Sequence, residues 1–545
     1  MVIEKNKVYT AECLSLGSEG EGIVKIDGFT VFVNGMLPGE KGKILIVKVK
    51  KSFGYGKLTE LIEPSPERAV PPCPYYKTCG GCSIQHMSYK AQLEFKRNKV
   101  RDCVERIGGI FGAEYPETIG MDEPWRYRNK AQYPVGKDRD GKTVIGFYAP
   151  RSHRITDIDG CMLQMDGSEK IIEITRKYIE KYNVPVYDET AHSGLLRHVI
   201  TRTSRSTGEM MVTFVINGKN LPHSGELIEE LRKTGYVASV ALNINREKTN
   251  AILGDKSLTL WGKDTIRDEI GGVKFDISSL SFYQVNPVQT EKLYGLAIDA
   301  AGLTGRETVI DVYCGIGTIS LLAAKKAKTV HGIEIVERAV EDAKANAVIN
   351  GIENASFEAG KAEDILPKMY AEGTRADVIF VDPPRKGLEP SVIEAVCGME
   401  PDRIVYVSCD PATLARDIKW LGAHGYEFQE ATPCDMFPWT GHVETVVLLS
   451  KGEIDSKKVQ VEFSLEDMDM SGFQNDATYS QIKKRVLQQT GLKVSSLYIA
   501  QVKQKYGIIE RENYNKPKSE NAKQPKCPPE KEAAITEALK YFGMI

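Results

Sequence analysis

The sequence predicts an α/β fold whose main part is a Rossmann-like open sheet, and two segments carry that prediction. Residues 308–321, TVIDVYCGIGTISL, contain an apolar strand, a tight turn at Gly315 and Gly317, and then a helix. Residues 404–417, IVYVSCDPATLARD, repeat the strand-to-helix pattern, and the Asp-Pro step forces a turn between the two elements. Ligands in such sheets bind at the carboxyl ends of the strands, so we expect the site there.

Acidic residues follow two further strands of the predicted sheet. Glu334, in VHGIEIV, lies about 20 positions after the glycine turn, where a ribose-binding carboxylate is expected. A strand at 377–381 ends in Asp382, within DPPRKG. No Lys-Ser/Thr pair follows the glycine turn, which argues against a nucleoside triphosphate. A sheet that binds NAD is the alternative, although its loop usually carries a third glycine where this chain has Ser320.

Two side chains at strand ends are candidates for chemistry. Cys409 lies where the strand at 404–407 stops, immediately before the Asp-Pro turn. A free cysteine is most often a small core residue, but the strand-tip position favours a thiol presented to a ligand. Glu444 lies in the strand-like run HVETVVLL, where a buried glutamate is costly unless it is paired. The alternative for Glu444 is a solvated position on an edge strand.

Residues 1–63 are predicted to form a small OB-like β-barrel. Glycines and the segment LPGE mark its turns, between strands at Val8–Leu14, Gly22–Ile26, Phe29–Val33, Lys43–Lys50 and Gly56–Glu63. Lysines gather here beside Phe53 and Tyr55, namely Lys41, Lys43, Lys48, Lys50, Lys51 and Lys57. Cations beside aromatic rings suit single-stranded RNA, and a merely solvated edge is the alternative.

Residues 64–270 are predicted to form an α+β central domain, with a helix at 89–107 followed by a sheet-rich section. Cys73, Cys79 and Cys82 lie close together around a Gly-Gly pair, so they can surround one face of a metal centre while a fourth ligand comes from elsewhere. Zinc or an iron–sulfur cluster suits such thiols, and the spacing alone favours zinc. Aromatics interleave with cations in 125–130, 147–154, 195–198 and at Arg202, which suits RNA.

The third predicted domain, residues 271–452, contains the open sheet. Residues 453–545 do not continue its alternation of strands and helices. A charged linker at 452–458 precedes short helices expected at 479–489, 495–505 and 530–542. The polar segment 512–531 between the last two helices is expected to be mobile. This C-terminal extension is either a helical accessory module for RNA or an appended piece without a direct role.

Composition limits the class of protein. The chain has 545 residues, a formal net charge of −2 and 41% hydrophobic residues, so any nucleic-acid site must be a local basic face. No apolar run approaches the about 18 residues of a membrane span, and the N-terminus does not read as a signal peptide. We therefore expect a cytoplasmic protein without a membrane partner. Eleven cysteines in such a chain indicate metal binding or catalysis, not disulfides.

Five motifs occur in the order typical of one enzyme family: SFYQVNP at 281–287, DVYCGIG at 311–317, FVDPPRKG at 380–387, VSCDPATLARD at 407–417 and GHVETVVLL at 441–449. With them the chain resembles the RNA uracil-5-methyltransferases, especially the bacterial 23S rRNA members that carry a TRAM domain and a [4Fe–4S] cluster. The resemblance covers roughly the first 450 residues. It implies a class I methyltransferase domain at 271–452 and a TRAM domain at 1–63.

The resemblance also implies roles for individual residues. Cys409 is expected to be the nucleophile and Glu444 the base, while Gln284, Tyr313, Glu334 and Asp382 hold S-adenosylmethionine. Cys161 takes the fourth ligand position beside Cys73, Cys79 and Cys82, and the family favours iron–sulfur at these cysteines. The family often has asparagine where this chain has Thr318, and an adenine contact near Lys361 is not placed. The expected partner is RNA, most of all 23S rRNA, and the protein is expected to be a monomer.

The chemistry explains why this family needs those residue types. C5 of uracil is a poor nucleophile until a thiolate adds to C6, after which C5 attacks a sulfonium methyl group and a base removes the C5 proton. A transfer RNA methyltransferase and a non-catalytic RNA-binding iron–sulfur protein are the alternatives. Methylation of an amino group is a third, since Asp-Pro-Pro loops also serve that reaction. It needs no cysteine nucleophile, so Cys409 argues against it.

Overall fold

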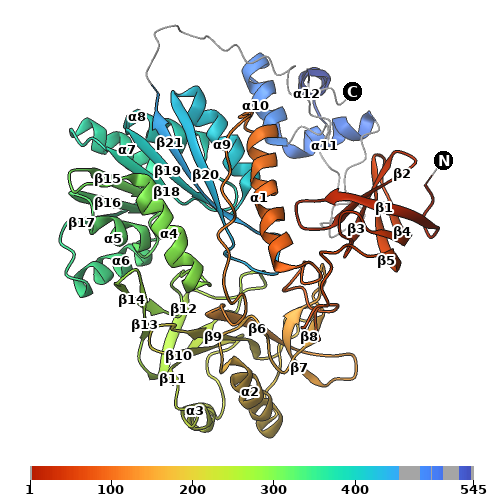
Figure 1. Ribbon diagram of the computed structural model, residues 1–545, viewed down its shortest axis with the longest axis vertical. Coiled ribbons are helices and arrows are strands. Elements are labelled where there is room, and N and C mark those ends of the chain that lie inside the picture. Colours follow the sequence, from red (N-terminus) through yellow and green to blue (C-terminus); the bar gives the residue numbers. More distant parts are fainter. Residues whose placement is uncertain (1–2, 453–478, 493, 507–526, 542–545) are drawn as a thin grey trace. The chain divides into compact units, whose positions relative to one another are not determined.

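The computed structural model describes residues 3–452, 479–492, 494–506 and 527–541. The chain divides into two compact units, Met1–Ile454 and Asp455–Ile545. Figure 1 labels the elements of both units. The finer boundaries expected within the first unit, at residues 63 and 270, stay a prediction.

The N-terminal strands close into a barrel, as expected. They are β1 (Val8–Leu16), β2 (Gly22–Ile26), β3 (Phe29–Asn34), β4 (Lys41–Val49) and β5 (Phe53–Glu63), paired in the order β1-β2-β3-β5-β4. Alternating apolar side chains point inward, including Val24, Val31, Val33, Ile44 and Ile46, all fully buried or nearly so. Closure leaves no unpaired sheet edge, which lets so few strands form a stable core.

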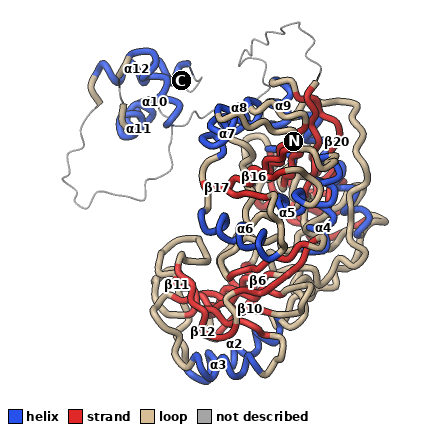
Figure 2. Tube along the Cα trace, turned by 90° about the vertical axis from the view of Figure 1, so that its left-hand side faces the viewer, coloured by secondary structure: helices blue, strands red, loops and turns tan. Residues whose placement is uncertain are grey.

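Helix α1 (Tyr89–Arg106) follows the cysteine segment and begins where Ser88 caps it, because the Ser88 hydroxyl accepts a hydrogen bond from the Ala91 amide. A seven-stranded sheet comes next in the order β12-β11-β10-β9-β6-β7-β8. Its strands are β6 (Lys130–Lys137), β7 (Thr143–Tyr148), β8 (Ile155–Asp157), β9 (Leu196–Thr203), β10 (Met210–Ile216), β11 (Val237–Ile244) and β12 (Lys256–Gly262). Helices α2 (Ser168–Tyr182) and α3 (Ser224–Arg232) pack together against this central sheet (Figure 2).

A hairpin, β13 (Thr265–Ile270) and β14 (Val273–Ser278), leads into a second seven-stranded sheet of order β17-β16-β15-β18-β19-β21-β20. Its strands are β15 (Thr308–Val312), β16 (Thr329–Glu334), β17 (Ala355–Ala359), β18 (Val378–Val381), β19 (Arg403–Ser408), β20 (Tyr426–Cys434) and β21 (Glu444–Lys451). The strands from β17 to β19 run parallel, and β21 pairs antiparallel with β19 and β20. The Rossmann-like α/β sheet predicted from the glycine turn is confirmed.

Helices cover both faces of this second sheet because its strands are apolar on both sides. They are α4 (Pro287–Ala301), α5 (Thr318–Ala324), α6 (Glu337–Ile349), α7 (Ala362–Ala371), α8 (Pro390–Gly398) and α9 (Pro411–Ala423). Neighbouring residues of one strand enter different cores: Val309 packs with α4 and α5, whereas Ile310 packs with α7, α8 and α9. Helix α1 adds Val100 and Val104 to the second of these cores.

In its described residues, the second unit contains three short helices close to the expected positions, α10 (Tyr479–Thr490), α11 (Ser496–Lys505) and α12 (Pro529–Tyr541). They share a small core of Ile482, Val486, Ile499, Val502, Ile535 and Leu539. The expected charged linker and mobile polar segment lie, apart from their ends, outside the described residues. None of the helices in the described ranges is long and apolar enough to cross a membrane.

Candidate active site

One cleft of about 1090 Å³ collects all six residues that the sequence predicts for catalysis and cofactor binding in the second sheet. They are Gln284, Tyr313, Glu334, Asp382, Cys409 and Glu444. The cleft lies where β15, β16, β18 and β19 end. The strand order reverses between β15 and β18, so their connections leave in opposite directions and open a crevice at the strand ends. Residues far apart in the sequence therefore meet because of sheet topology.

The glycine turn after β15 has the strained backbone that its sequence suggests. Gly315 and Gly317 have φ of +56° and +83°, and Tyr313 between strand and turn has φ of +69°, which is uncommon outside glycine. The turn fixes Glu334, whose carboxylate accepts hydrogen bonds from the Gly315 amide at 3.1 Å and the Val336 amide at 3.0 Å. The remaining lone pairs of that carboxylate are available to a ligand hydroxyl.

Two aspartates at strand ends line the cleft, Asp311 fully buried and Asp382 half-buried. Burial raises the pKa of Asp311 to about 7, and it does the same to the pKa of Asp382, with Asp311 as a second cause. One oxygen of Asp311 accepts a hydrogen bond from Ser320 at 2.5 Å, while its other oxygen is buried without a partner. Buried carboxylates of raised pKa are stabilised by a cation, so this part of the cleft suits a positively charged ligand.

Cys409 is half-buried at the end of β19, as its strand-tip position predicts. The following turn is built by Asp410, whose carboxylate caps α9 by accepting hydrogen bonds from the Ala412 and Thr413 amides. Burial raises the pKa of the Cys409 thiol to about 11, and the carboxylates of Glu444 and Asp382 raise it further, while the Arg385 guanidinium lowers it. The thiol is therefore protonated near neutral pH until a ligand changes its surroundings.

Glu444 begins β21, the strand that pairs antiparallel with β19. Ser408 faces Thr445 in that register, which brings Glu444 beside Cys409. Only 4% of Glu444 is exposed, so the solvated alternative is wrong. Burial raises its pKa to about 8, with Asp382 adding to the rise and Arg385 opposing it. A carboxyl group with a pKa near neutrality is well placed to exchange protons.

Arg385 is a site residue to which the sequence reasoning assigned no role, although it lies inside the motif FVDPPRKG. It is the cation that lowers the pKa of both Cys409 and Glu444. Helix α9 holds its loop: Thr413 donates to the Arg385 carbonyl at 3.2 Å, and Asp417 accepts from the Leu388 amide at 2.7 Å. A side chain on Gly387 would collide with Asp417. A basic residue after an Asp-Pro-Pro turn was the signal for this role.

The remaining predicted contacts also reach the cleft. The Gln284 amide group donates to the Tyr294 hydroxyl at 3.3 Å, and the Gln284 carbonyl accepts from Asn129 at 3.0 Å. Thr318 and Lys361 line the cleft as well. Thr318 stands where the family often has asparagine, and no adenine contact is assigned near Lys361. Cys314 of the glycine turn also lines the cleft, although only 6% of it is exposed.

The four cysteines predicted as ligands are all half-buried and lie near one another. Burial is the main cause that raises the pKa of Cys79, and the nearby Cys161 and Cys73 raise it further. Burial likewise raises the pKa of Cys82, with smaller contributions from Cys161, Cys79 and Cys73. The Gly81 amide donates to the Cys79 sulfur at 3.3 Å. Within the described ranges, however, no group of three or more His, Cys, Asp or Glu side chains is arranged to hold a metal ion. The ligand set stays a prediction.

Two of the aromatic residues predicted to contact RNA, Phe53 and Tyr55, lie on the barrel. Phe32, Phe53 and Tyr55 form an aromatic cluster on the barrel with ring centroids 5.6–6.0 Å apart, and the Arg151 guanidinium lies 5.8 Å from the Tyr55 ring. Lys41 and Lys43 instead pair with glutamates of β5.

The prediction is wrong for β9. Arg197, His198 and Arg202 are no more than 6% exposed, and both arginines donate to backbone carbonyls. A strand residue buried by the fold has no free surface to offer to RNA.

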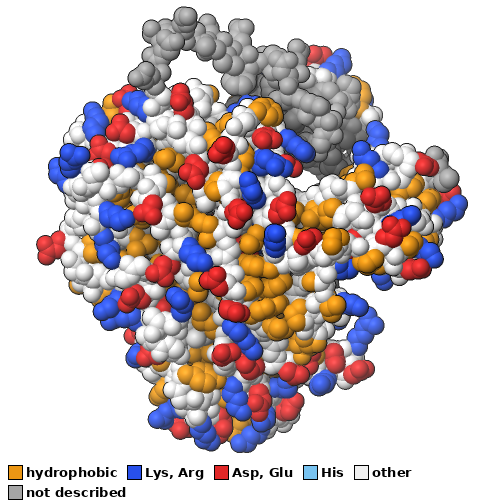
Figure 3. All heavy atoms as spheres, viewed as in Figure 1, with side chains coloured by type: hydrophobic (Ala, Val, Ile, Leu, Met, Phe, Trp, Pro, Cys, Tyr) orange, Lys and Arg blue, Asp and Glu red, His pale blue; other side chains and the backbone are white. Residues whose placement is uncertain are grey.

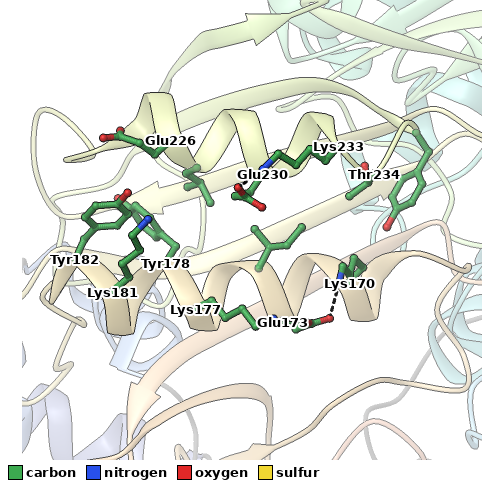
Figure 4. Close-up of a pocket in the computed structure, with 13 residues that line it drawn as sticks. Lys170, Glu173, Lys177, Tyr178, Lys181, Tyr182, Glu226, Glu230, Lys233 and Thr234 are labelled. Carbon is green, nitrogen blue, oxygen red and sulfur yellow. Dashed lines mark hydrogen bonds and ion pairs between the residues drawn. The ribbon is translucent and has the colours of Figure 1, made fainter.

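A second cavity of about 620 Å³ lies between α2 and α3 of the central domain (Figure 4). Lysines line it, but Lys170 and Lys177 both pair with Glu173, and Lys233 pairs with Glu230. None of the predicted site residues reaches it. Figure 3 shows cations and anions intermixed over the face in view, in keeping with the net charge of −2. The cleft of the second sheet is therefore the candidate active site.

Comparisons with known proteins identify the family of the chain. The sequence matches the family described as tRNA (uracil-5-)-methyltransferase over residues 89–452 and the TRAM domain over residues 4–59. A protein named as an uncharacterized RNA methyltransferase of Halalkalibacterium halodurans is 50% identical over 448 residues, covering 82% of this chain and 98% of that protein. A similarly named protein of Clostridium tetani is 51% identical over 449 residues, covering 82% and 97%.

A solved structure extends the comparison to three dimensions. Pyrococcus abyssi tRNA (uracil-54, C5)-methyltransferase, in complex with S-adenosyl-L-homocysteine, aligns with a TM-score of 0.65 and 30% identity, covering 81% of this chain and 99% of that chain. The family match ends at residue 452, so the second unit lies outside it. The chain therefore belongs to the tRNA (uracil-5-)-methyltransferase family, and it is an S-adenosylmethionine-dependent RNA methyltransferase.

Proposed function

We propose that this enzyme methylates C5 of a specific uridine in RNA through a transient covalent bond between Cys409 and C6 of the uracil. The observation that carries the proposal is that Cys409 and Glu444, on paired strands, line one cleft together with Asp382 and Arg385. A thiol beside a carboxyl group of raised pKa supplies both groups that this reaction needs.

The reaction has two stages at these residues. The Cys409 thiolate adds to C6, and the electron pair of the C5–C6 double bond makes C5 the nucleophile. S-adenosylmethionine supplies the electrophilic methyl group. The ionised carboxylate of Glu444 then removes the C5 proton, the double bond forms again, and Cys409 leaves as a thiolate.

The surroundings of the cleft fit the cofactor and the thiolate. We assign Gln284, Tyr313, Glu334 and Asp382 as the contacts of S-adenosylmethionine, because all four line the same cleft and the buried carboxylates favour a sulfonium cation. Arg385 favours the anionic forms of Cys409 and Glu444. Its positive charge offsets part of the penalty that burial imposes on a thiolate.

The direct test of the covalent step uses RNA that carries 5-fluorouridine at the target. Fluorine replaces the proton that Glu444 would remove, so release is blocked and a stable protein–RNA adduct should form on Cys409. Mass spectrometry of the digested adduct identifies the attached residue. Absence of any adduct from a protein that methylates normal RNA would overturn the covalent mechanism.

We propose 23S rRNA as the substrate, because a TRAM domain and the cysteine set accompany the ribosomal members that the chain resembles. Transfer RNA is the second candidate, favoured by the name of the Pyrococcus abyssi relative and the description of the family. Mapping of 5-methyluridine in ribosomal and transfer RNA, from cells with and without the protein, separates the two. The missing modification identifies the substrate.

We propose that the aromatic cluster of Phe32, Phe53 and Tyr55, with Arg151 beside it, is the RNA-binding surface of the barrel. Bases stack on aromatic rings and phosphates attract the neighbouring cations. We also propose that the enzyme acts as a cytoplasmic monomer, for which light scattering of the purified protein is the test.

We propose further that Cys73, Cys79, Cys82 and Cys161 hold a [4Fe–4S] cluster. Four neighbouring thiols, one of them accepting a backbone hydrogen bond, are a suitable donor set for such a cluster. Methyl transfer from a sulfonium needs no electron, so the cluster would order the cysteine loop. Protein purified without oxygen should be brown and contain about four irons. Stoichiometric zinc without iron would overturn this assignment.

A further inference from the structure

The segment that joins β20 to Glu444, residues 435–443, lies inside the protein although it has no regular secondary structure; we call it the base loop. Asp435, Met436 and Val443 are completely buried. Phe437 and His442 of the same loop line the active-site cleft. Since buried backbone groups require hydrogen-bond partners, something outside the loop must satisfy them.

Helix α1 supplies many of these partners from one face. Gln92, Lys96 and Lys99 are spaced by four and three residues, so their side chains point in the same direction. The Gln92 side chain accepts a hydrogen bond from the Trp439 amide at 3.1 Å. Lys96 donates to the Phe437 carbonyl at 3.1 Å, and Lys99 donates to the Gly441 carbonyl at 2.9 Å.

The contact between Lys96 and Asp435 is a buried ion pair. Neither side chain has exposed surface, and the second oxygen of Asp435 accepts a hydrogen bond from the Tyr89 hydroxyl at 2.9 Å. A fully buried lysine is rare in proteins. A buried ion pair contributes little net stability compared with apolar residues of the same size, but it fixes the position of its partners.

The loop is held in one strained shape. Trp439 has φ of +70°, a conformation that costs free energy unless surrounding contacts enforce it. Its indole donates to the Pro124 carbonyl at 2.8 Å and stacks on Trp125 with centroids 4.2 Å apart. The loop continues without a break into Glu444, so any shift of it moves the proposed base.

We propose that Lys96 and Asp435 are positioning residues for catalysis: their buried ion pair holds the base loop so that Glu444 reaches the C5 proton of the methylated uracil. The proposal rests on the proposed function, in which Glu444 acts only after methyl transfer. Neither residue lines the cleft, so neither is expected to touch RNA or cofactor.

The test is the double variant Lys96→Met/Asp435→Asn, which removes both charges together and avoids leaving one of them buried alone. We expect kcat for methylation to fall about 100-fold, the scale of a misplaced catalytic group. KM for RNA should fall with it, because slow release of a covalent intermediate lowers both, so that kcat/KM and the Kd of S-adenosylmethionine stay almost unchanged. Protein attached covalently to methylated RNA should accumulate during turnover, because proton removal has become the slow step. A thermal unfolding midpoint measured on the same sample reports whether the variant is folded.

The matched control is Arg176→Met/Asp157→Asn. That ion pair, at 2.9 Å, joins α2 to β8 of the central domain and lines neither the cleft nor the base loop. It should leave kcat and the adduct fraction at wild-type values.

Two results for the Lys96→Met/Asp435→Asn variant would overturn the positioning role. One is a lower kcat without accumulated adduct, and the other is a wild-type kcat. If that variant does not fold, Lys99→Met is the second test, because it removes only the bond to Gly441. It should give the same accumulation to a smaller extent, and wild-type kinetics would overturn the proposal. A failure of the proposed function is recognised separately, because the unmodified enzyme would then form no adduct with 5-fluorouridine RNA.

Discussion

Two seven-stranded sheets lie in the first compact unit, and they use buried charged side chains differently. In the central sheet, Arg197 of β9 donates to the Asn245 and Glu247 carbonyls and lies 4.4 Å from the Tyr187 ring. In the second sheet, the buried Asp311 and Glu444 and the half-buried Asp382 lie at strand ends and line a cleft. The buried arginines of the central sheet direct hydrogen bonds to backbone carbonyls of the protein itself, whereas the acids of the second sheet line a cleft that a ligand can enter.

The difference follows from topology. Apart from β10 and β11, the pairs of the central sheet are antiparallel. Its cavity lies between two helices, where Lys170 and Lys177 both pair with Glu173. The parallel strands of the second sheet all end at one edge, and the reversal between β15 and β18 opens that edge. The candidate catalytic side chains therefore lie in the second sheet. Substitutions there should lower methylation much more than substitutions in the central sheet.

The largest effect is expected from Cys409→Ala. Methylation should fall by several orders of magnitude, the scale of loss when a covalent nucleophile is removed, because the proposed nucleophile is then missing. S-adenosylmethionine should still bind, since its proposed contacts remain. Activity is measured as methyl transfer to RNA and binding by calorimetry. A Cys409→Ala protein that still methylates uridine would end the mechanism.

The next effect concerns Glu444. Removal of a general base costs about 10²- to 10⁴-fold, and Glu444→Gln should accumulate protein attached to methylated RNA. Burial raises the pKa of Glu444 to about 8. Only the ionised form takes the proton. Below that pKa, release from the adduct should therefore become about tenfold faster with each unit rise in pH, and above it the rate should level off. Quenched-flow measurements of adduct decay from pH 6 to 9 test this.

The control for that pH dependence is Glu444→Gln itself, which has no carboxyl group to ionise. Its slow release should not change with pH across the same interval. An equal pH dependence in both proteins would assign the ionisation to another group, such as the Cys409 thiol.

A smaller effect is expected on the barrel. Replacing Phe53 and Tyr55 with alanine should weaken RNA binding by about 1–3 kcal/mol for each stacked base that is lost. Replacing Lys48, Lys50 and Lys51 with alanine should also flatten the salt dependence, because fewer phosphate counterions are released. Filter binding at several salt concentrations measures both. Unchanged RNA affinity and salt slope would remove the barrel from the binding surface, and lost cofactor binding would indicate a damaged fold.

The smallest effect is expected in the cavity between α2 and α3. Lys177→Ala removes an exposed ion pair with Glu173, and such pairs contribute little to stability because solvent screens them. Methylation and RNA affinity should stay at wild-type values. A clear loss of RNA binding would show that the central sheet carries a second functional surface and would weaken the contrast drawn above.

The sequence by itself determined the second sheet and most of the site. Strand ends marked by Gly315, Asp382 and Cys409 are local signals, because turn chemistry and the residue before proline restrict the backbone over a few positions. The family motifs then predict roles for Gln284 and Glu444, and both residues line the cleft. The barrel was predictable for the same reason, since alternating apolar residues between glycine turns define its strands.

Only the tertiary structure decided which of the predicted residues are accessible and what holds them in place. Aromatics and cations along β9 suggested RNA contacts, but the sheet buries Arg197 and Arg202, and burial depends on elements distant in the sequence. The pairing of Lys96 with Asp435 joins residues more than 300 positions apart, and no local pattern indicates it. Packing between segments distant in the sequence sets these contacts, whereas a sequence pattern indicates only the local secondary structure of the residues within it.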